Sequence, residues 1–403
     1  MGLAAGPTSP DLGDEGYDSP RAWGMVAASF VSMFVVFGVA YSFGAFFGPI
    51  SRTFHAGSGA TSLVFSLTAF AYFALGAVSG PAADRFGPRV VLAVGAVVMG
   101  AGVAATSLVG RLWLAYLTYG LGVGVGVACG YVPMLGVVGG WFRRRRSTAL
   151  GVAVAGIGVG TLAISPLAAV LIDHIGWRHT EVVFGALSAV LLAACAVVAR
   201  RPPAHAGGPV GAPGRQVLLS PAFVWLYVSG ILGSMALYIP FVFLVPYAHG
   251  RGMSRVAAAS LVGLVGASST VGRLALGPVA ERAGLLRSYR ACFVVLGGSF
   301  LFWLVGRSAL WLIVFALVFG LGYGGFIALS PAVAAELFGV RGLGGVLGVL
   351  YSGAGLGALV GPPLAGLVID VTGSYEWAVG AGLILSAGAL VCLLPLRPGM
   401  APA

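Results

Sequence analysis

Apolar residues form long runs along this chain, separated by short connections rich in glycine, proline and arginine. A helix of about 20 apolar residues is long enough to cross the roughly 30 Å hydrocarbon core of a bilayer. The pattern therefore predicts an all-α, polytopic membrane protein with twelve spanning helices. They are expected near residues 22–50, 60–81, 90–109, 113–140, 148–172, 180–199, 221–248, 256–279, 289–306, 309–338, 343–369 and 377–396.

The longest polar break divides these spans into two groups of six. It begins at Arg200 with RRPPAHAGGPVGAPGRQ, a composition typical of a linker. The first residues of the chain are polar, acidic and rich in proline and glycine, which predicts a disordered tail and no signal peptide. The expected organisation is a cytoplasmic tail at 1–20, a six-helix bundle at 21–200, a cytoplasmic linker at 201–219, a second six-helix bundle at 220–397 and a cytoplasmic tail at 398–403.

The low content of charged residues and the positions of the arginines indicate a membrane protein. Hydrophobic residues make up 59% of the chain and charged residues 8%, whereas soluble domains carry about 25% charged residues. The net charge of +11 could indicate a nucleic-acid partner, but the arginines cluster in the connections between spans, where basic residues face the cytoplasm. Of the 22 arginines, fifteen lie on the side of the two termini, six on the opposite side, and Arg273 within a span. We therefore expect an inner-membrane protein with cytoplasmic termini and no nucleic-acid partner.

The two groups of spans repeat each other in sequence. GPAADRFG at Gly80 recurs as GPVAERAG at Gly277, an offset of 197 residues. At the same offset, the segment from Leu150 matches the segment from Leu347, with identical positions that include Gly156/Gly353, Gly158/Gly355, Gly160/Gly357, Pro166/Pro363 and Asp173/Asp370. Two pseudo-symmetric six-helix bundles are the architecture of a secondary transporter whose binding site lies between the halves near the membrane midplane.

The repeated loop also points to a family. It resembles the signature loop between spans two and three of the major facilitator superfamily. The matching positions are Gly80, Asp84, Arg85, Gly87 and Arg89, with a weaker copy at Gly277, Glu281 and Arg282. The resemblance implies a cytoplasmic latch that joins the halves and breaks as they rock.

Three further segments resemble the monocarboxylate transporter family and its bacterial relatives, which include the oxalate–formate antiporters. They are WFRRRRSTALGVAVAGIGVG at 141–160, GPPLAGLVIDVTGSYEWA at 361–378 and RAWGMV at 21–26. The resemblance implies a transporter of small monocarboxylates, working as a monomer on an organic anion with or without a proton. It implies no enzyme activity and no cofactor.

Arg273 is the main candidate for substrate binding. It lies eight residues before Glu281, about 12 Å along a helix, which places it deep in a hydrocarbon core whose half-thickness is about 15 Å. Inserting an arginine at that depth costs a free energy of about 2.5–3.5 kcal/mol, so we expect its charge to be paired. The resemblance places the family's carboxylate-binding arginine here. The alternative is a structural arginine satisfied by backbone carbonyls and Glu336.

The chain departs from the family at two coupling positions. Ser269 stands where mammalian members have an aspartate, and Tyr41 stands where they have a lysine. The second cation of the bacterial oxalate antiporter is also missing from span eleven, so one carboxylate fits better than two. An oxalate–formate type exchanger and a multidrug efflux pump remain the alternatives.

Other polar residues within the spans are secondary candidates. A buried tyrosine hydroxyl usually has a polar partner, so tyrosines in glycine-rich spans are expected at the binding cavity. His249, at the outer end of span seven, is a candidate proton-coupling residue. The cysteines have no metal-ligand spacing, and we expect no metal site. The candidate substrate-binding residues are Arg273, Tyr131, Tyr323, Tyr351, Tyr41, Ser269 and Cys129.

Overall fold

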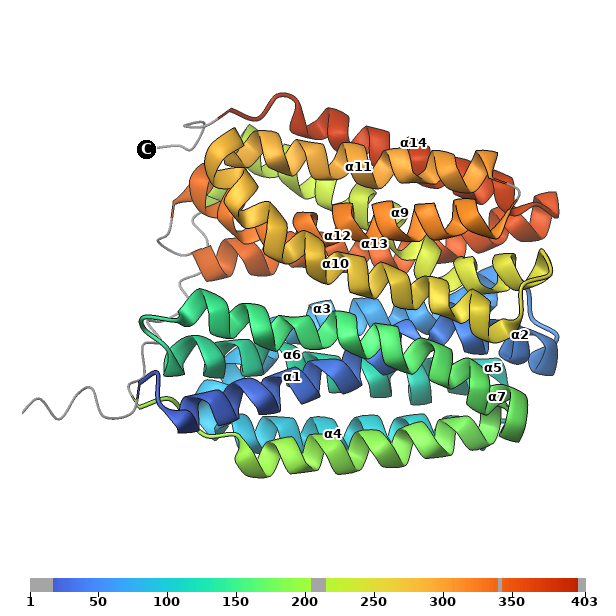
Figure 1. Ribbon diagram of the computed structural model, residues 1–403, viewed down its shortest axis with the longest axis horizontal. Helices are drawn as coiled ribbons and strands as arrows, with labels where there is room; N and C mark the ends of the chain where they lie inside the picture. The colour runs from blue at the N-terminus through green and yellow to red at the C-terminus, as the bar shows by residue number, and fades with distance from the viewer. Residues whose placement is uncertain (1–16, 204–214, 307, 340–342, 398–403) are drawn as a thin grey trace, which may run out of the picture.

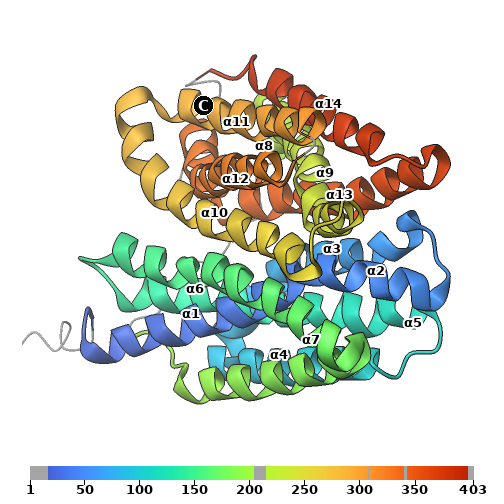
Figure 2. The same ribbon diagram turned by 45° about the vertical axis from the view of Figure 1, so that its right-hand side comes forward.

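The computed structural model describes residues 17–203, 215–306, 308–339 and 343–397, and within these ranges every regular element is helical. Two groups of helices lie side by side with their long axes nearly aligned (Figures 1 and 2). The first group is α1 (Pro20–Tyr41), α2 (Phe43–Phe54), α3 (Ser58–Phe86), α4 (Pro88–Thr106), α5 (Leu112–Ala115), the π-helix η1 (Tyr116–Leu121), α6 (Gly122–Trp141) and α7 (Arg146–Val198). After the short α8 (Arg215–Leu218), the second group is α9 (Pro221–Gly250), α10 (Arg255–Ala283), α11 (Leu285–Val305), α12 (Ala309–Phe338), α13 (Leu343–Thr372) and α14 (Tyr375–Leu393).

Eleven continuous helical segments of the described chain are long and apolar enough to cross a membrane. One of them, α7, has 53 residues and reverses direction at Gly176, whose φ of 78° breaks the helix. It therefore crosses twice, first to about residue 175 and then back from residue 177. The all-α, twelve-span prediction is confirmed. The sequence pattern predicts a loop at 173–179, whereas in the structure Gly176 alone makes the turn.

The sequence repeat is also a repeat of backbone geometry. Gly87 and Gly284, 197 residues apart, have φ values of 94° and 91° at the turns that follow α3 and α10. Gly176 and Gly373, at the same offset, have φ values of 78° and 66°. Residues other than glycine rarely adopt positive φ, so these four positions impose the same turns on both halves.

The same offset governs how the helices pack within each half. A Cβ atom at Gly160 would collide with the carbonyl oxygen of Phe34, and one at Gly357 would collide with that of Ile231. Both the glycines and their neighbours are 197 residues apart. The glycines allow α7 to approach α1, and α13 to approach α9, at backbone contact distance.

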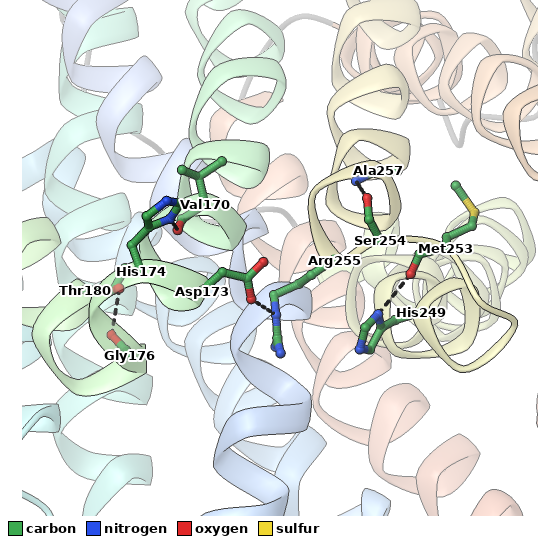
Figure 3. A network of polar contacts seen from close by, with 10 residues as sticks. All are labelled: Val170, Asp173, His174, Gly176, Thr180, His249, Met253, Ser254, Arg255 and Ala257. Atoms are coloured by element: carbon green, nitrogen blue, oxygen red, sulfur yellow. Dashed lines mark hydrogen bonds and ion pairs between the residues drawn. The ribbon is translucent and has the colours of Figure 1, made fainter.

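The two ends of the molecule differ in chemistry. We call the end where α1 begins and where Arg143–Arg146 lie the basic end, and the end where α7 turns at Gly176 the kink end (left and right in Figure 1). At the kink end the halves are joined by polar contacts. Asp173 forms an ion pair of 2.6 Å with Arg255, and the Asp370 carboxylate accepts hydrogen bonds of 2.7 and 3.0 Å from two backbone N–H groups, of Ser58 and Gly59 (Figure 3 shows the first of these contacts).

These kink-end contacts obey the pseudo-symmetry. Asp173 and Asp370 are 197 residues apart, and so are their partners Ser58 and Arg255, the first residues of α3 and α10. Each aspartate therefore ends a helix of one half and binds the start of a helix of the other half. At the basic end, no hydrogen bond or ion pair joins the halves within the described ranges. The molecule is closed at the kink end.

The expected tails and linker lie mostly outside the described residues, which leave out 1–16, 204–214 and 398–403. The last part of the predicted disordered tail is structured. The Asp18 carboxylate accepts hydrogen bonds from the backbone N–H groups of Arg143, Arg144 and Arg145. These bonds, that from Arg144 first, lower the pKa of Asp18 and tie the start of α1 to the loop between α6 and α7.

Candidate functional site

Arg273 lies on α10, where the helix faces the space between the halves. The preceding residue, Gly272, is packed against the backbone of α12 at Leu321. Since successive helix residues are about 100° apart, Arg273 points away from that contact. Its Cζ atom lies 5.6 Å from the centre of the Tyr323 ring, a cation–π contact.

The guanidinium group of Arg273 is not neutralised by the protein. Its Nε and Nη1 atoms are buried and have no hydrogen-bond partner, and no ion pair joins it to an acidic residue of the described chain. Glu336, the alternative partner considered from the sequence, is exposed. Buried donors without partners are costly, more so when they carry charge. Arg273 therefore carries two buried donors that no residue of the described chain satisfies.

A layer of paired tyrosines lies beside Arg273, toward the kink end. The Tyr41 and Tyr323 hydroxyls are 3.1 Å apart, and those of Tyr72 and Tyr238 are 2.6 Å apart. Each pair joins one half to the other. Phe241 stacks on Tyr41 with ring centres 4.3 Å apart and an interplanar angle of 24°. The layer closes the space between Arg273 and the kink end.

Tyr131 and Tyr351 border the same region. The Tyr131 ring meets Phe37 edge to face at 5.2 Å, and its hydroxyl lies within electrostatic range of Arg273. Tyr351 remains 38% exposed, with its ring 6.2 Å from that of Phe73 on the opposite half. The structure therefore places Tyr323 against Arg273, Tyr131 within electrostatic range of it and Tyr41 against Tyr323, whereas Tyr351 contacts Phe73.

Three other candidates lie elsewhere. Cys129 packs on Gly95 of α4, because two residues of helix place it on the face opposite Tyr131. Ser269 is buried against the backbone of α12, and its hydroxyl donates to the Gly266 carbonyl at 2.8 Å. His249 is exposed at the kink end, where its Nδ1 atom is 3.0 Å from the Met253 carbonyl oxygen (Figure 3). Cys129 and Ser269 therefore lie away from the space beside Arg273, contrary to their expected place in the binding cavity, whereas His249 lies at the outer end of its span, as the sequence predicts.

Sequence reasoning missed Tyr72 and Tyr238. Tyr238 carried a usable signal, because it is the repeat equivalent of Tyr41 at the 197-residue offset. Tyr72 carried none, since its repeat equivalent is Ser269 and tyrosine is common in spans.

The repeated loop motif lies at the basic end. Gly80 of α3 faces Val132 of α6, and the carbonyl of Arg85 accepts a hydrogen bond of 2.8 Å from Arg201. Within the described ranges Asp84 has no ion pair, and it lines a groove of about 520 Å³ in the first half. The remaining charged motif residues, Arg85, Arg89, Glu281 and Arg282, are exposed. The groove is separate from Arg273 and contains none of the tyrosine pairs.

A duplicated bundle with an unpaired buried cation between its halves defines a polytopic transport protein. The family model described as the Major Facilitator Superfamily matches residues 29–306 and 272–403. Monocarboxylate transporter 3 of Rattus norvegicus is 32% identical over 387 residues, covering 90% of this chain and 78% of the relative. Monocarboxylate transporter 13 of Bos taurus is 31% identical over 386 residues, covering 93% and 90%.

A solved structure shares the fold. The bacterial homologue of the human lysosomal transporter Spinster, in an inward-facing and occupied conformation, superposes with a TM-score of 0.73 and 17% identity, covering 94% of this chain and 96% of that one. Together these matches show that the chain belongs to the monocarboxylate transporter family of the major facilitator superfamily. It is a transporter and not an enzyme.

Proposed function

We propose that this protein is a secondary transporter of small monocarboxylates that works by alternating access. The observation that carries the proposal is the half-buried Arg273, whose Nε and Nη1 atoms are buried donors without partners and which lies near Tyr131 of one half and Tyr323 of the other. A carboxylate can accept two parallel hydrogen bonds from a guanidinium group, which makes this anion a good geometric match. The names of the mammalian relatives agree with that substrate class.

The surroundings of Arg273 favour one carboxylate over two. It is the one arginine in the interior of a span, and α13 offers no second cation near Tyr351. The tyrosine hydroxyls can hydrogen-bond a keto or hydroxyl oxygen next to the carboxylate, while Phe37 and Phe241 contact a short aliphatic body. Lactate and pyruvate have this chemistry.

The closed kink end suggests which state the molecule occupies. We propose that the basic end faces the cytoplasm of an inner membrane, as the arginine distribution favours. Closure at the kink end, with Asp84 unpaired at the basic end, then corresponds to an inward-facing state in which the cytoplasmic latch is released. The latch of Asp84 and the arginines around it would form when the halves rock to the outward-facing state.

The test is uptake by the purified monomer in proteoliposomes. Labelled lactate, pyruvate, acetate, formate and oxalate are supplied with and without a pH gradient. We expect lactate or pyruvate uptake to fall at least about tenfold in Arg273→Ala, since the charged hydrogen bonds lost are each worth about 1.5–3 kcal/mol. Arg273→Lys keeps the charge and loses the planar pair of donors, so an intermediate rate is expected.

Arg287→Ala is the control, because Arg287 is an exposed arginine on α11. Its uptake should equal that of the wild type. Unchanged monocarboxylate uptake by Arg273→Ala would refute the proposed binding role. Preference for oxalate over monocarboxylates would favour the oxalate–formate type of exchange.

A further inference from the structure

Glu181 is a fully buried carboxyl group that the proposed transport site does not use. It lies on α7 five residues after Gly176, about 7 Å into the bundle from the kink end at 1.5 Å per residue. Its side chain has 0% exposure, and neither carboxyl oxygen has a hydrogen-bond partner. An ionised carboxylate in such a place would be strongly destabilised, so the closed structure accommodates the neutral, protonated form.

No cation of the surrounding helices compensates Glu181. The only charged residue of α4 is Arg89, at the basic end, and the only one of α2 is the exposed Arg52. Neither α5, η1 nor α6 contains a charged residue, Arg111 at the N-cap of α5 is exposed, and Arg21, the charged residue of α1, is exposed at the basic end. On α7 itself, the nearby Arg178 donates to the carbonyl groups of Ser107 and Val109.

The remaining titratable groups near Glu181 already have partners. On α7, the Nδ1 atoms of His174 and His179 each lie within hydrogen-bond distance of a backbone carbonyl one turn earlier (Figure 3 shows His174). On η1, Tyr116 donates to the Ala60 carbonyl, and Tyr119 donates to the Val39 carbonyl. Tyr119 is the titratable group within electrostatic range of Glu181, and it cannot neutralise a carboxylate.

The helix that seals this region also takes part in closing the kink end. One face of α2 packs on the first half, where Phe46 lies 6.0 Å from Phe184 and Phe43 lies 5.6 Å from Tyr119, measured between ring centres. The other face packs on α9 of the second half, where the Phe47 and Phe243 ring centres are 5.3 Å apart. At Ser42, whose backbone stays in the right-handed helical region, α1 ends and α2 begins, so both belong to one span from Pro20 to Phe54.

We propose that Glu181 is a proton-binding site that links protonation from the kink end to closure of that end. When α2 leaves α9, the carboxyl group gains access to water and loses its proton. When α2 packs back, the carboxylate must first take up a proton, because the closed site offers no partner for the charge. Acid at the kink end therefore favours closure. The inference rests on the alternating access proposed above and is independent of the substrate.

The test measures the conformation of substrate-free protein. Spin labels are placed at Arg52→Cys, at the exposed end of α2, and at Trp377→Cys, which is 68% exposed at the start of α14. The native cysteines are all buried, so the labels are specific. Raising the pH from about 5.5 to about 8.5 should increase the population with the long label-to-label distance, which is the open state. Once the pH exceeds the pKa of Glu181 in the open state, each further pH unit lowers the closed-to-open ratio by up to about tenfold.

Glu181→Gln removes the titration while keeping the shape, and the distance distribution should then stay closed at both pH values. Glu181→Met, uncharged and of similar size, should behave in the same way and guards against misfolding of the first variant. Glu336→Gln changes an exposed carboxylate at the basic end and should keep the wild-type response. A wild type without pH response, or a Glu181→Gln variant with the wild-type response, would overturn the proposal. Neither result would bear on monocarboxylate binding by Arg273.

Discussion

Asp370→Ala removes a contact that exists only when the kink end is closed. Its carboxylate accepts two backbone hydrogen bonds from the start of α3, at Ser58 and Gly59, where the N-cap residue is Gly57 and has no side chain to cap the helix. A hydrogen bond to a charged group is worth about 1.5–3 kcal/mol. Since Asp370 is exposed, we discount the pair to about 1–2 kcal/mol, the usual value of a helix N-cap.

This free energy acts entirely on the equilibrium between the closed and open kink end. A change of about 1–2 kcal/mol corresponds to a shift of roughly 5–30-fold in favour of the open state. The assay is the labelling rate of a cysteine at Ala259 by a membrane-impermeant maleimide. Ala259 is fully buried in the closed state, and its carbonyl oxygen accepts a hydrogen bond from Ser165 of the other half.

The chain offers matched controls for this measurement. Asp173→Ala removes the symmetry-related contact to Arg255 and should accelerate labelling in the same direction. Glu376→Ala breaks an exposed ion pair to Arg251 that lies within one half, and the labelling rate should not change. If Asp370→Ala labelled at the wild-type rate, the kink-end aspartates would not contribute to closure, and the reasoning from the symmetric contacts would be refuted.

Two further predictions concern the turns and the start of α1. Gly176→Ala should lower the apparent melting temperature in detergent by about 1–4 °C, because its backbone at φ of 78° and ψ of 160° is open essentially to glycine alone and costs about 1–3 kcal/mol with a Cβ atom. Gly110→Ala, in equally open space without that backbone, should leave it unchanged. The backbone hydrogen bonds lower the pKa of Asp18. The Asp18 contacts that anchor the start of α1 are therefore fully present above the ordinary aspartate pKa of about 4, and they are lost as the pH falls through the lowered pKa. In the wild type, protease cleavage before Pro20 should accelerate in that acidic range. In Asp18→Ala it should already be fast at neutral pH, and equal cleavage rates for the two proteins at neutral pH would contradict this prediction.

Arg273 could be identified from the sequence because a charged residue inside a long apolar segment stands out without knowledge of the fold. The tyrosine pairs could not, because the hydrogen bonds of Tyr41 to Tyr323 and of Tyr72 to Tyr238 depend on how two separate bundles meet. Cys129 illustrates the opposite error. It is adjacent to Tyr131 in sequence, yet the helical rotation of two residues directs it to α4.

Glu181 shows how a single backbone angle changes the role of a residue. The sequence pattern placed it beside a loop, near the end of a span. In the structure the chain reverses at Gly176 alone, so the next helix begins at once and carries Glu181 into the core. Its burial without a partner follows from that turn.

The sequence by itself determined the twelve spans, the duplication and the position of the intramembrane cation, because apolar length, a fixed 197-residue offset and an isolated charge are local properties of the chain. Tertiary structure alone decided that the kink end is closed, which tyrosines pair across the halves, and that Glu181 is buried without a partner. These depend on the relative position of helices far apart in sequence. In a transporter that position changes during function, so no single sequence pattern encodes it.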